Sequence, residues 1–196
     1  MSAIPISPAA EPWVLPSRGR VAMLSLIIGE SAIFTIFVIA YIFYIGKGLS
    51  GPTPQQVLDI PIFNTICLLS SSVTIWLAER QIDRGKMKAF AAWWALTIAL
   101  GLVFIVGTGF EWHKLIYVDG LTVHTNLFGT TFYSLVGLHA THVVVGLLML
   151  SLVLLFTLTG RVKERHSERI QVLALYWHFV DAVWVVVFTV VYIVGR

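Results

Sequence analysis

Five long apolar stretches constrain the fold of this chain more than any other feature of its sequence. They run approximately over residues 21–45, 61–78, 90–112, 126–159 and 172–194. An α-helix rises about 1.5 Å per residue, so each stretch is long enough to cross a hydrocarbon core of about 30 Å. We therefore expect an all-α integral membrane protein with five transmembrane helices.

The composition supports this expectation and excludes several other classes of protein. The 196 residues are 58% hydrophobic and only 12% charged. A soluble domain carries about a quarter charged residues, so the chain is not an ordinary cytosolic enzyme, a disordered protein or a nucleic-acid binder. Cys67 is the single cysteine. It excludes a disulfide within the chain and a cysteine cluster for zinc or iron–sulfur ligation.

Residues 1–20 differ in composition from the rest and are expected to form an extended tail. The tail is rich in proline, at Pro5, Pro8, Pro12 and Pro16, and shows no helical period. It lacks the basic start and short apolar run of a cleavable signal peptide. Residues 21–196 are then expected to form one five-helix membrane domain.

The distribution of basic residues predicts the orientation of the helices. Ten of the thirteen Lys and Arg residues lie before the first span, between spans two and three, or between spans four and five. These three segments emerge on the same side of the membrane, and the positive-inside rule assigns that side to the cytoplasm. The N-terminus is therefore expected in the cytoplasm and the C-terminus outside.

Five ionisable side chains lie near mid-depth of the predicted spans, where they are energetically costly and therefore informative. His139 and His142 are three positions apart on one helix, as are His178 and Asp181, so each pair shares a helix face. Glu30 of the first span falls at a depth similar to that of His142 and Asp181. A carboxylate and an imidazole at matching depth on neighbouring helices can satisfy each other.

These residues are open to several interpretations from sequence alone. The plainest is that they form polar contacts between helices. Glu30 could instead take up and release protons, as in a small transporter. Alternatively, these ionisable residues could together recognise a lipid head group. Histidines on two helices could ligate haem in a bis-histidine b-type membrane anchor. A zinc site has the necessary residue types but no signature spacing such as HExxH.

Sequence motifs in the last two spans resemble a known family. Residues 176–184 read YWHFVDAVW, and they resemble the last helix of subunit III of the haem–copper terminal oxidases. Residues 128–133 read FGTTFY and residues 137–143 read GLHATHV, and together they resemble the preceding helix of that family.

The earlier spans extend the resemblance over nearly the whole chain after Arg18. In span three, Glu111 and Trp112 follow a Gly101-x-x-Phe104 pattern, and residues 64–74 read NTICLLSSSVT, both similar to the family. Glu30 resembles the family's buried, carbodiimide-reactive glutamate. We therefore expect the intramembrane polar residues to pair, Glu30 with His139 or His142 and His178 with Asp181. The chain departs from the usual family residues at three positions, Thr108, Val136 and Ala140.

The resemblance is to the five-helix bacterial form of cytochrome c oxidase subunit III, and it implies a fold, a location and a function. It implies a V-shaped bundle with a lipid-binding cleft in the bacterial cytoplasmic membrane. It implies a redox-silent subunit that holds phospholipid, packs against subunit I and supports proton uptake, while haem and copper reside in partner subunits. Subunit II, subunit IV and a respiratory supercomplex are further implied partners.

Two alternatives within the same fold stay open from the sequence. These are subunit III of a quinol oxidase and a homologue associated with nitric-oxide reductase.

Overall fold

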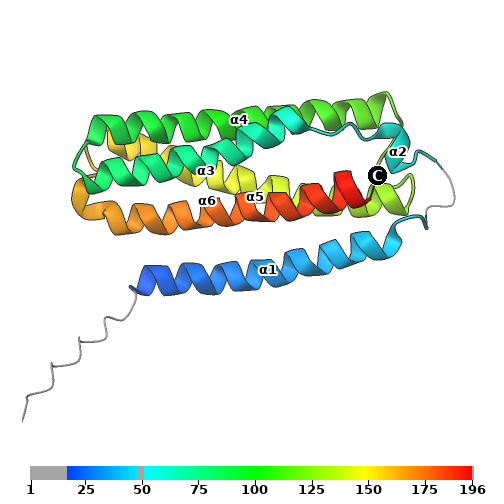
Figure 1. Cartoon of the computed structure of the whole chain (residues 1–196), viewed down its shortest axis with the longest axis horizontal. Coiled ribbons are helices and arrows are strands. Elements are labelled where there is room, and N and C mark those ends of the chain that lie inside the picture. The colour runs from blue at the N-terminus through cyan, green and yellow to red at the C-terminus, as the bar shows by residue number, and fades with distance from the viewer. Residues whose placement is uncertain (1–16, 48–50, 196) are drawn as a thin grey trace, which may run out of the picture.

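The computed structural model describes residues 17–47 and 51–195, and every regular element in these ranges is helical (Figure 1). Five helices are long and apolar enough to cross a membrane, which confirms the predicted fold class. The long helices are α1 (Arg18–Tyr44), α3 (Ile62–Asp83), α4 (Met87–Tyr117), α5 (Leu127–Leu158) and α6 (Ser167–Phe188), and α6 continues as the π-helix η2 (Thr189–Val194).

The start of α1 differs from the sequence expectation. Residues 18–20 were expected in the tail, but α1 begins at Arg18. The reason is a cap: the side chain of Ser17 accepts a hydrogen bond from the backbone N–H of Arg20, which satisfies one of the free donors at the helix start. The remainder of the expected tail, residues 1–16, lies outside the described residues.

The helices also extend beyond the apolar stretches. α3 continues past residue 78 to Asp83, and α4 continues past residue 112 to Tyr117. Hydropathy marks only the part of a helix that crosses hydrocarbon, whereas the backbone hydrogen bonds continue through the polar interface. Two short elements were not expected, α2 (Pro54–Val57) and the 3-10 turn η1 (Glu164–His166).

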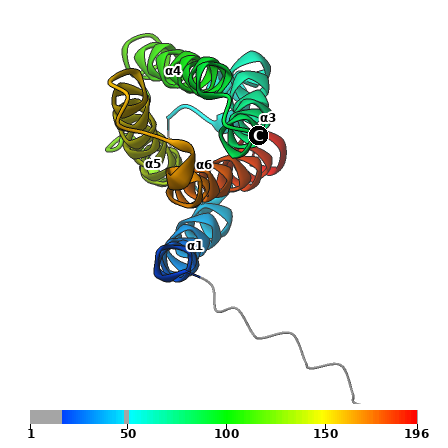
Figure 2. The same cartoon turned by 90° about the vertical axis from the view of Figure 1, so that its left-hand side faces the viewer.

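Four of the long helices form a closed group, and the fifth lies outside it. Viewed along the helices, α3, α4, α5 and α6 surround a common centre, and α1 packs against α5 and α6 from outside (Figure 2). α3 and α4 form an antiparallel hairpin turned at Gly85, whose φ of 69° favours glycine. The V shape, the lipid cleft and the orientation in the membrane stay predictions.

Trp177 of α6 fixes the centre of this four-helix group. Its side chain is fully buried, and its indole N–H donates to Ser71 Oγ of α3 at 2.8 Å. A Cβ atom at Gly101 of α4 would lie 2.9 Å from the Trp177 ring, and one at Gly146 of α5 would lie 2.8 Å from it. Glycine at these two positions therefore lets one indole contact three neighbouring helices at once.

The outer surface of the bundle carries large apolar side chains. Ile28 and Ile36 of α1 and Phe110 of α4 are 71%, 66% and 74% exposed. Water would penalise this exposure strongly, whereas the hydrocarbon of a bilayer accepts it. The buried side chains thus lie between the helices, and the exposed apolar side chains are placed to contact lipid or partner subunits.

Candidate functional site

Glu30 and His142 join α1 to α5. Glu30 Oε2 lies 3.2 Å from His142 Nε2, and both side chains are mostly buried. The sequence offered His139 and His142 as partners for Glu30, and the structure selects His142. Phe34, one turn beyond Glu30, covers the His142 ring with a centroid separation of 5.0 Å.

The second ring nitrogen of His142 fixes where its proton lies. Nδ1 is 2.8 Å from the backbone carbonyl oxygen of Leu138, and a carbonyl oxygen can only accept, so Nδ1 carries a hydrogen. A neutral ring then has a bare Nε2, and Glu30 must be protonated to donate to it. A charged ring instead donates to an ionised Glu30. In either case one proton lies between Glu30 Oε2 and His142 Nε2.

His139 has surroundings different from those of His142. It is fully buried, and neither ring nitrogen has a hydrogen-bond partner among the described residues. Its ring stacks on Trp184 at 4.9 Å between centroids and meets the Phe104 ring edge-on at 5.8 Å. His139 therefore packs as an aromatic side chain within the bundle, against the rings of Phe104 and Trp184.

His178 and Asp181 share a face of α6, and their spacing suggested a direct pair, but they do not form one. Both contact Ser72 of α3 instead: Ser72 Oγ donates to Asp181 Oδ2 and lies 3.0 Å from His178 Nδ1. A hydroxyl has one hydrogen, so when Ser72 donates to Asp181 it accepts from His178. The other side of the His178 ring faces Glu79, with 3.9 Å between Nε2 and Oε2. The four groups form a polar chain along the α3–α6 contact.

Sequence reasoning did not include Ser72 and Glu79 among the site residues. A usable signal was present, because residues 72 and 79 are seven positions apart and so lie on one face of α3. In the sequence, Ser72 stood out only as part of the family-like motif of residues 64–74.

The family-motif residues Glu111 and Trp112 lie near the end of α4. Glu111 Oε1 accepts a hydrogen bond of 2.8 Å from the hydroxyl of Tyr192 in η2. The Trp112 ring meets Tyr133 of α5 edge-on at 5.2 Å. Lys114, one turn beyond Glu111, pairs with Asp59 at 2.5 Å. These contacts hold α4 to α5, to η2 and to the segment before α3.

The arrangement does not favour a bis-histidine haem site. His142 is engaged with Glu30 of α1, whereas His178 is engaged with Ser72 of α3. Within the described ranges, no group of three or more His, Cys, Asp and Glu side chains is placed to hold a metal ion. The site residues therefore connect pairs of helices instead of converging on one ligand.

The fold and these contacts define a multi-pass membrane protein whose intramembrane polar groups join its helices. Comparison with known proteins specifies the family. The family model for cytochrome c oxidase subunit III matches residues 19–196. The chain belongs to that family, and this confirms the resemblance drawn from the motifs.

Individual relatives agree with the family match. The chain is similar to cytochrome c oxidase subunit 3 of Alkalihalophilus pseudofirmus, with 35% identity over 85% of this chain and 82% of the relative. It is 34% identical to the Synechocystis protein of the same name, over 91% of this chain and 76% of the relative. With the Thermostichus vulcanus protein of that name the identity is 31%, over 92% and 90%. Five apolar helices and bacterial relatives fit a multi-pass protein of the bacterial cytoplasmic membrane.

Proposed function

We propose that this chain is subunit III of a cytochrome c oxidase, that it carries no redox centre, and that it packs against subunit I. The observation that carries the proposal is the family match over residues 19–196. Haem and copper in partner subunits would supply the chemistry of O₂ reduction. This chain would bind phospholipid and support proton uptake and stability during turnover.

The Glu30–His142 contact supports a structural role for the intramembrane polar groups. Among the other long helices, α1 packs mainly against α5 and α6, and in the described part of the chain Glu30 and His142 form its one side-chain hydrogen bond to α5. Polar contacts of this kind stabilise helix association in membranes by about 0.6–2 kcal/mol. Glu30 would then hold α1 in place beside the four-helix group.

A difference spectrum tests the proposal directly. The tagged chain is purified from native membranes in mild detergent, and a reduced-minus-oxidised spectrum is recorded. Partners are then removed with a harsher detergent, and the spectrum is recorded again. We expect haem–copper oxidase bands in the first spectrum and none from the stripped chain. A b-type band that stays with the stripped chain would show that its histidines ligate haem, and the proposal would fail.

A further inference from the structure

Three aromatic side chains follow one another along the end of α6 and η2. Trp184, Phe188 and Tyr192 are spaced four positions apart, so they lie on one face of the helix. The ring centroids of Trp184 and Tyr192 are 6.3 Å apart, and Phe188 stacks on Tyr192 at 5.6 Å, both within the range of aromatic contact. Trp184 and Tyr192 are each 1% exposed. An electron can therefore pass between the indole and the phenol without crossing water.

The indole N–H of Trp184 has no proton acceptor in line with it among the described residues. It donates to Thr65 Oγ1 of α3 at 3.2 Å in a buried contact, and a threonine hydroxyl is not a base. His139 lies on the face of the indole at 4.9 Å between centroids, so it stacks on the ring and does not accept this hydrogen. An indole that lost an electron here would keep its proton and would remain a strong one-electron oxidant.

Tyr192 differs from Trp184 because its hydrogen points at a base. The Tyr192 hydroxyl donates to Glu111 Oε1 of α4 at 2.8 Å. An ionised carboxylate accepts hydrogen bonds and can take up a proton. A phenol that loses an electron becomes a strong acid, so a base within hydrogen-bond distance makes its oxidation much easier. The pair therefore suits the loss of one electron and one proton together.

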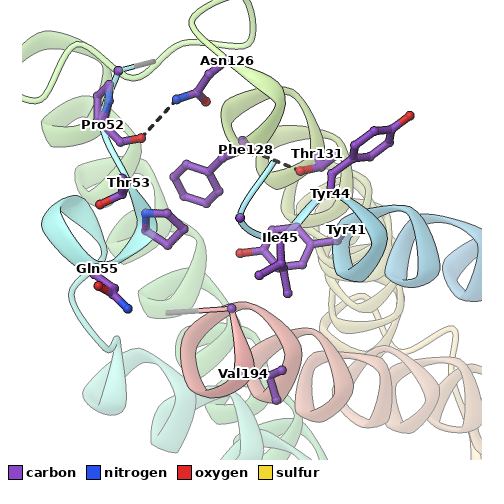
Figure 3. Close-up of a pocket in the computed structure, with 14 residues that line it drawn as sticks. Tyr41, Tyr44, Ile45, Pro52, Thr53, Gln55, Asn126, Phe128, Thr131 and Val194 are labelled. Carbon is purple, nitrogen blue, oxygen red and sulfur yellow. Dashed lines mark hydrogen bonds between the residues drawn. The ribbon is translucent and has the colours of Figure 1, made fainter. Parts of the chain in front are cut away.

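The other buried tyrosines lack such a base. The hydroxyls of Tyr133 and Tyr176 donate to backbone carbonyl oxygens at 2.8 and 3.2 Å, and a peptide carbonyl does not take up a proton. Tyr41 borders a cavity of about 310 Å³ at the end of the bundle (Figure 3), and its hydroxyl has no hydrogen-bond partner among the described residues. In the described part of the chain, Tyr192 is thus the one buried tyrosine that is joined to a proton acceptor.

Glu111 connects this pair to the surface of the protein. It borders a second cavity, of about 270 Å³, together with Asp59 and Lys114. The side chains of Lys114 and Asp59 are 49% and 80% exposed, so water reaches this cavity. A proton taken up by Glu111 has a route to water there, and a small molecule can approach the pair from the same side.

We propose that Trp184, Tyr192 and Glu111 form a relay that carries a one-electron oxidation from the interior of the bundle to its surface. The oxidant belongs to the class of aromatic radical cations, and it regains its neutral form when it takes one electron from Trp184. The resulting indole radical cation takes one electron from Tyr192. The phenolic O–H bond breaks, and its proton forms an O–H bond at Glu111 Oε1. The products are neutral Trp184, a neutral tyrosyl radical and protonated Glu111.

Reduction at the surface completes the cycle. A one-electron reductant such as ascorbate returns an electron to Tyr192, and Glu111 returns the proton. The oxidation then ends at the surface and leaves the bundle chemically unchanged. The source of the oxidant rests on the proposed function, because a partner subunit that reduces O₂ would generate oxidised aromatic side chains.

Flash photolysis of the oxidase complex that contains the full chain tests the relay. In a Cys67→Ser background, Val185→Cys carries a ruthenium tris-bipyridine label next to Trp184, since Val185 is 47% exposed. Light and a soluble electron acceptor convert the label to Ru(III), a one-electron oxidant that stands in for the natural one. Transient absorption and freeze-quench electron paramagnetic resonance then distinguish tryptophan radicals from tyrosyl radicals.

Three variants of the labelled complex separate the steps. We expect a tyrosyl radical in the labelled parent, and loss of that signal in both Tyr192→Phe and Glu111→Gln, with a tryptophan radical in its place. Glutamine keeps an acceptor for the Tyr192 hydroxyl but cannot take up its proton. Tyr133→Phe is the matched control, since it removes a buried tyrosine that has no base, and it should keep the tyrosyl signal.

A solvent isotope measurement tests the proton step without altering Tyr192 or Glu111. Because the phenolic proton moves with the electron, the tyrosyl radical should form more slowly in D₂O than in H₂O. Equal rates in the two solvents, or a parental tyrosyl yield in Tyr192→Phe, would overturn the proposal. The oxidant in this assay is photochemical, so its result is independent of the haem spectrum that tests the proposed subunit role.

Discussion

At the scale of single residues, the proton between Glu30 and His142 determines how substitutions at position 30 behave. Glu30→Gln keeps a donor, because the amide N–H₂ can donate to the bare Nε2 of His142. Glu30→Leu removes it and leaves Nε2 buried without a partner, which costs about 1–3 kcal/mol. We expect the leucine variant to be clearly less stable than the glutamine variant, as measured by thermal unfolding of the purified complex in detergent.

The oxidase spectrum is the control for these two variants. It should be the same as that of the wild type in the glutamine variant, since no haem contacts Glu30 in the proposed role. Loss of haem from the complex on Glu30→Gln would contradict that role. Equal destabilisation by glutamine and leucine would contradict the donor argument.

The sequence predicted some residue contacts and not others, for a geometric reason. Glu30 could be matched with a histidine of α5, because both lie near the middle of their spans. The choice of His142 over His139 depends on the rotation of α5 about its axis, which places His139 among the aromatic rings of Phe104 and Trp184. The joining of His178 and Asp181 through Ser72 depends on α3, which their spacing on α6 cannot report.

At the scale of helices, close packing around Trp177 predicts that substitutions at two glycines have very different effects on stability. A side chain at Gly146 would overlap the Trp177 ring, whereas a Cβ at Gly109 of α4 would meet nothing within 4 Å. We expect Gly146→Val to destabilise the chain by about 1–3 kcal/mol, the usual cost of overpacking a core. Gly109→Ala should be neutral or slightly stabilising, because alanine favours a helix more than glycine does.

Near-ultraviolet circular dichroism during heating measures this difference, since it reports the packing of the buried indoles. Similar unfolding midpoints for Gly146→Val and Gly109→Ala would contradict the role of Trp177 in joining α4, α5 and α6.

Helix positions were more predictable than helix contacts. Long apolar runs mark where a chain crosses hydrocarbon, so the sequence located the central part of each of the five spans correctly. Helix ends were less predictable, because Ser17 and the polar residues after residue 78 extend α1 and α3 by capping and backbone hydrogen bonds. α2 is too short to leave a periodic pattern.

At the scale of the whole molecule, the basic loops predict which side of the membrane each connection faces. Arg84 lies in the basic α3–α4 turn, and His124 lies exposed in the α4–α5 connection. In a Cys67→Ser background, we expect Arg84→Cys to react with a membrane-impermeant maleimide only after the membrane is permeabilised. His124→Cys should react in intact cells.

Each of the two cysteine variants is the control for the other, because their positions are predicted to lie on opposite sides of the membrane. The reverse labelling pattern would place the N-terminus outside and would contradict the positive-inside assignment.

The arrangement of the helices could not be derived from the sequence. Spans that are apolar on every side carry little information about which face is buried. The position of α1 outside the four-helix group depends on Phe34 and Tyr41, the two residues of α1 that the structure buries, and many other apolar residues of α1 are exposed. The intramembrane polar residues are the exception, since Glu30 correctly indicated contact with the fourth span.

The position of α1 has a consequence for the order of assembly during synthesis. Of the five long helices described, α1 is synthesised before the others, yet it packs against α5 and α6, which come fourth and fifth in the chain. Glu30 and His142 are separated by 112 positions, and at about 5–20 residues per second the ribosome needs roughly 5 to 20 seconds to cover that distance. During that interval Glu30 lies in an apolar helix without its native contact to His142. Only after His142 has been synthesised can Glu30 form this contact and hold α1 beside α5.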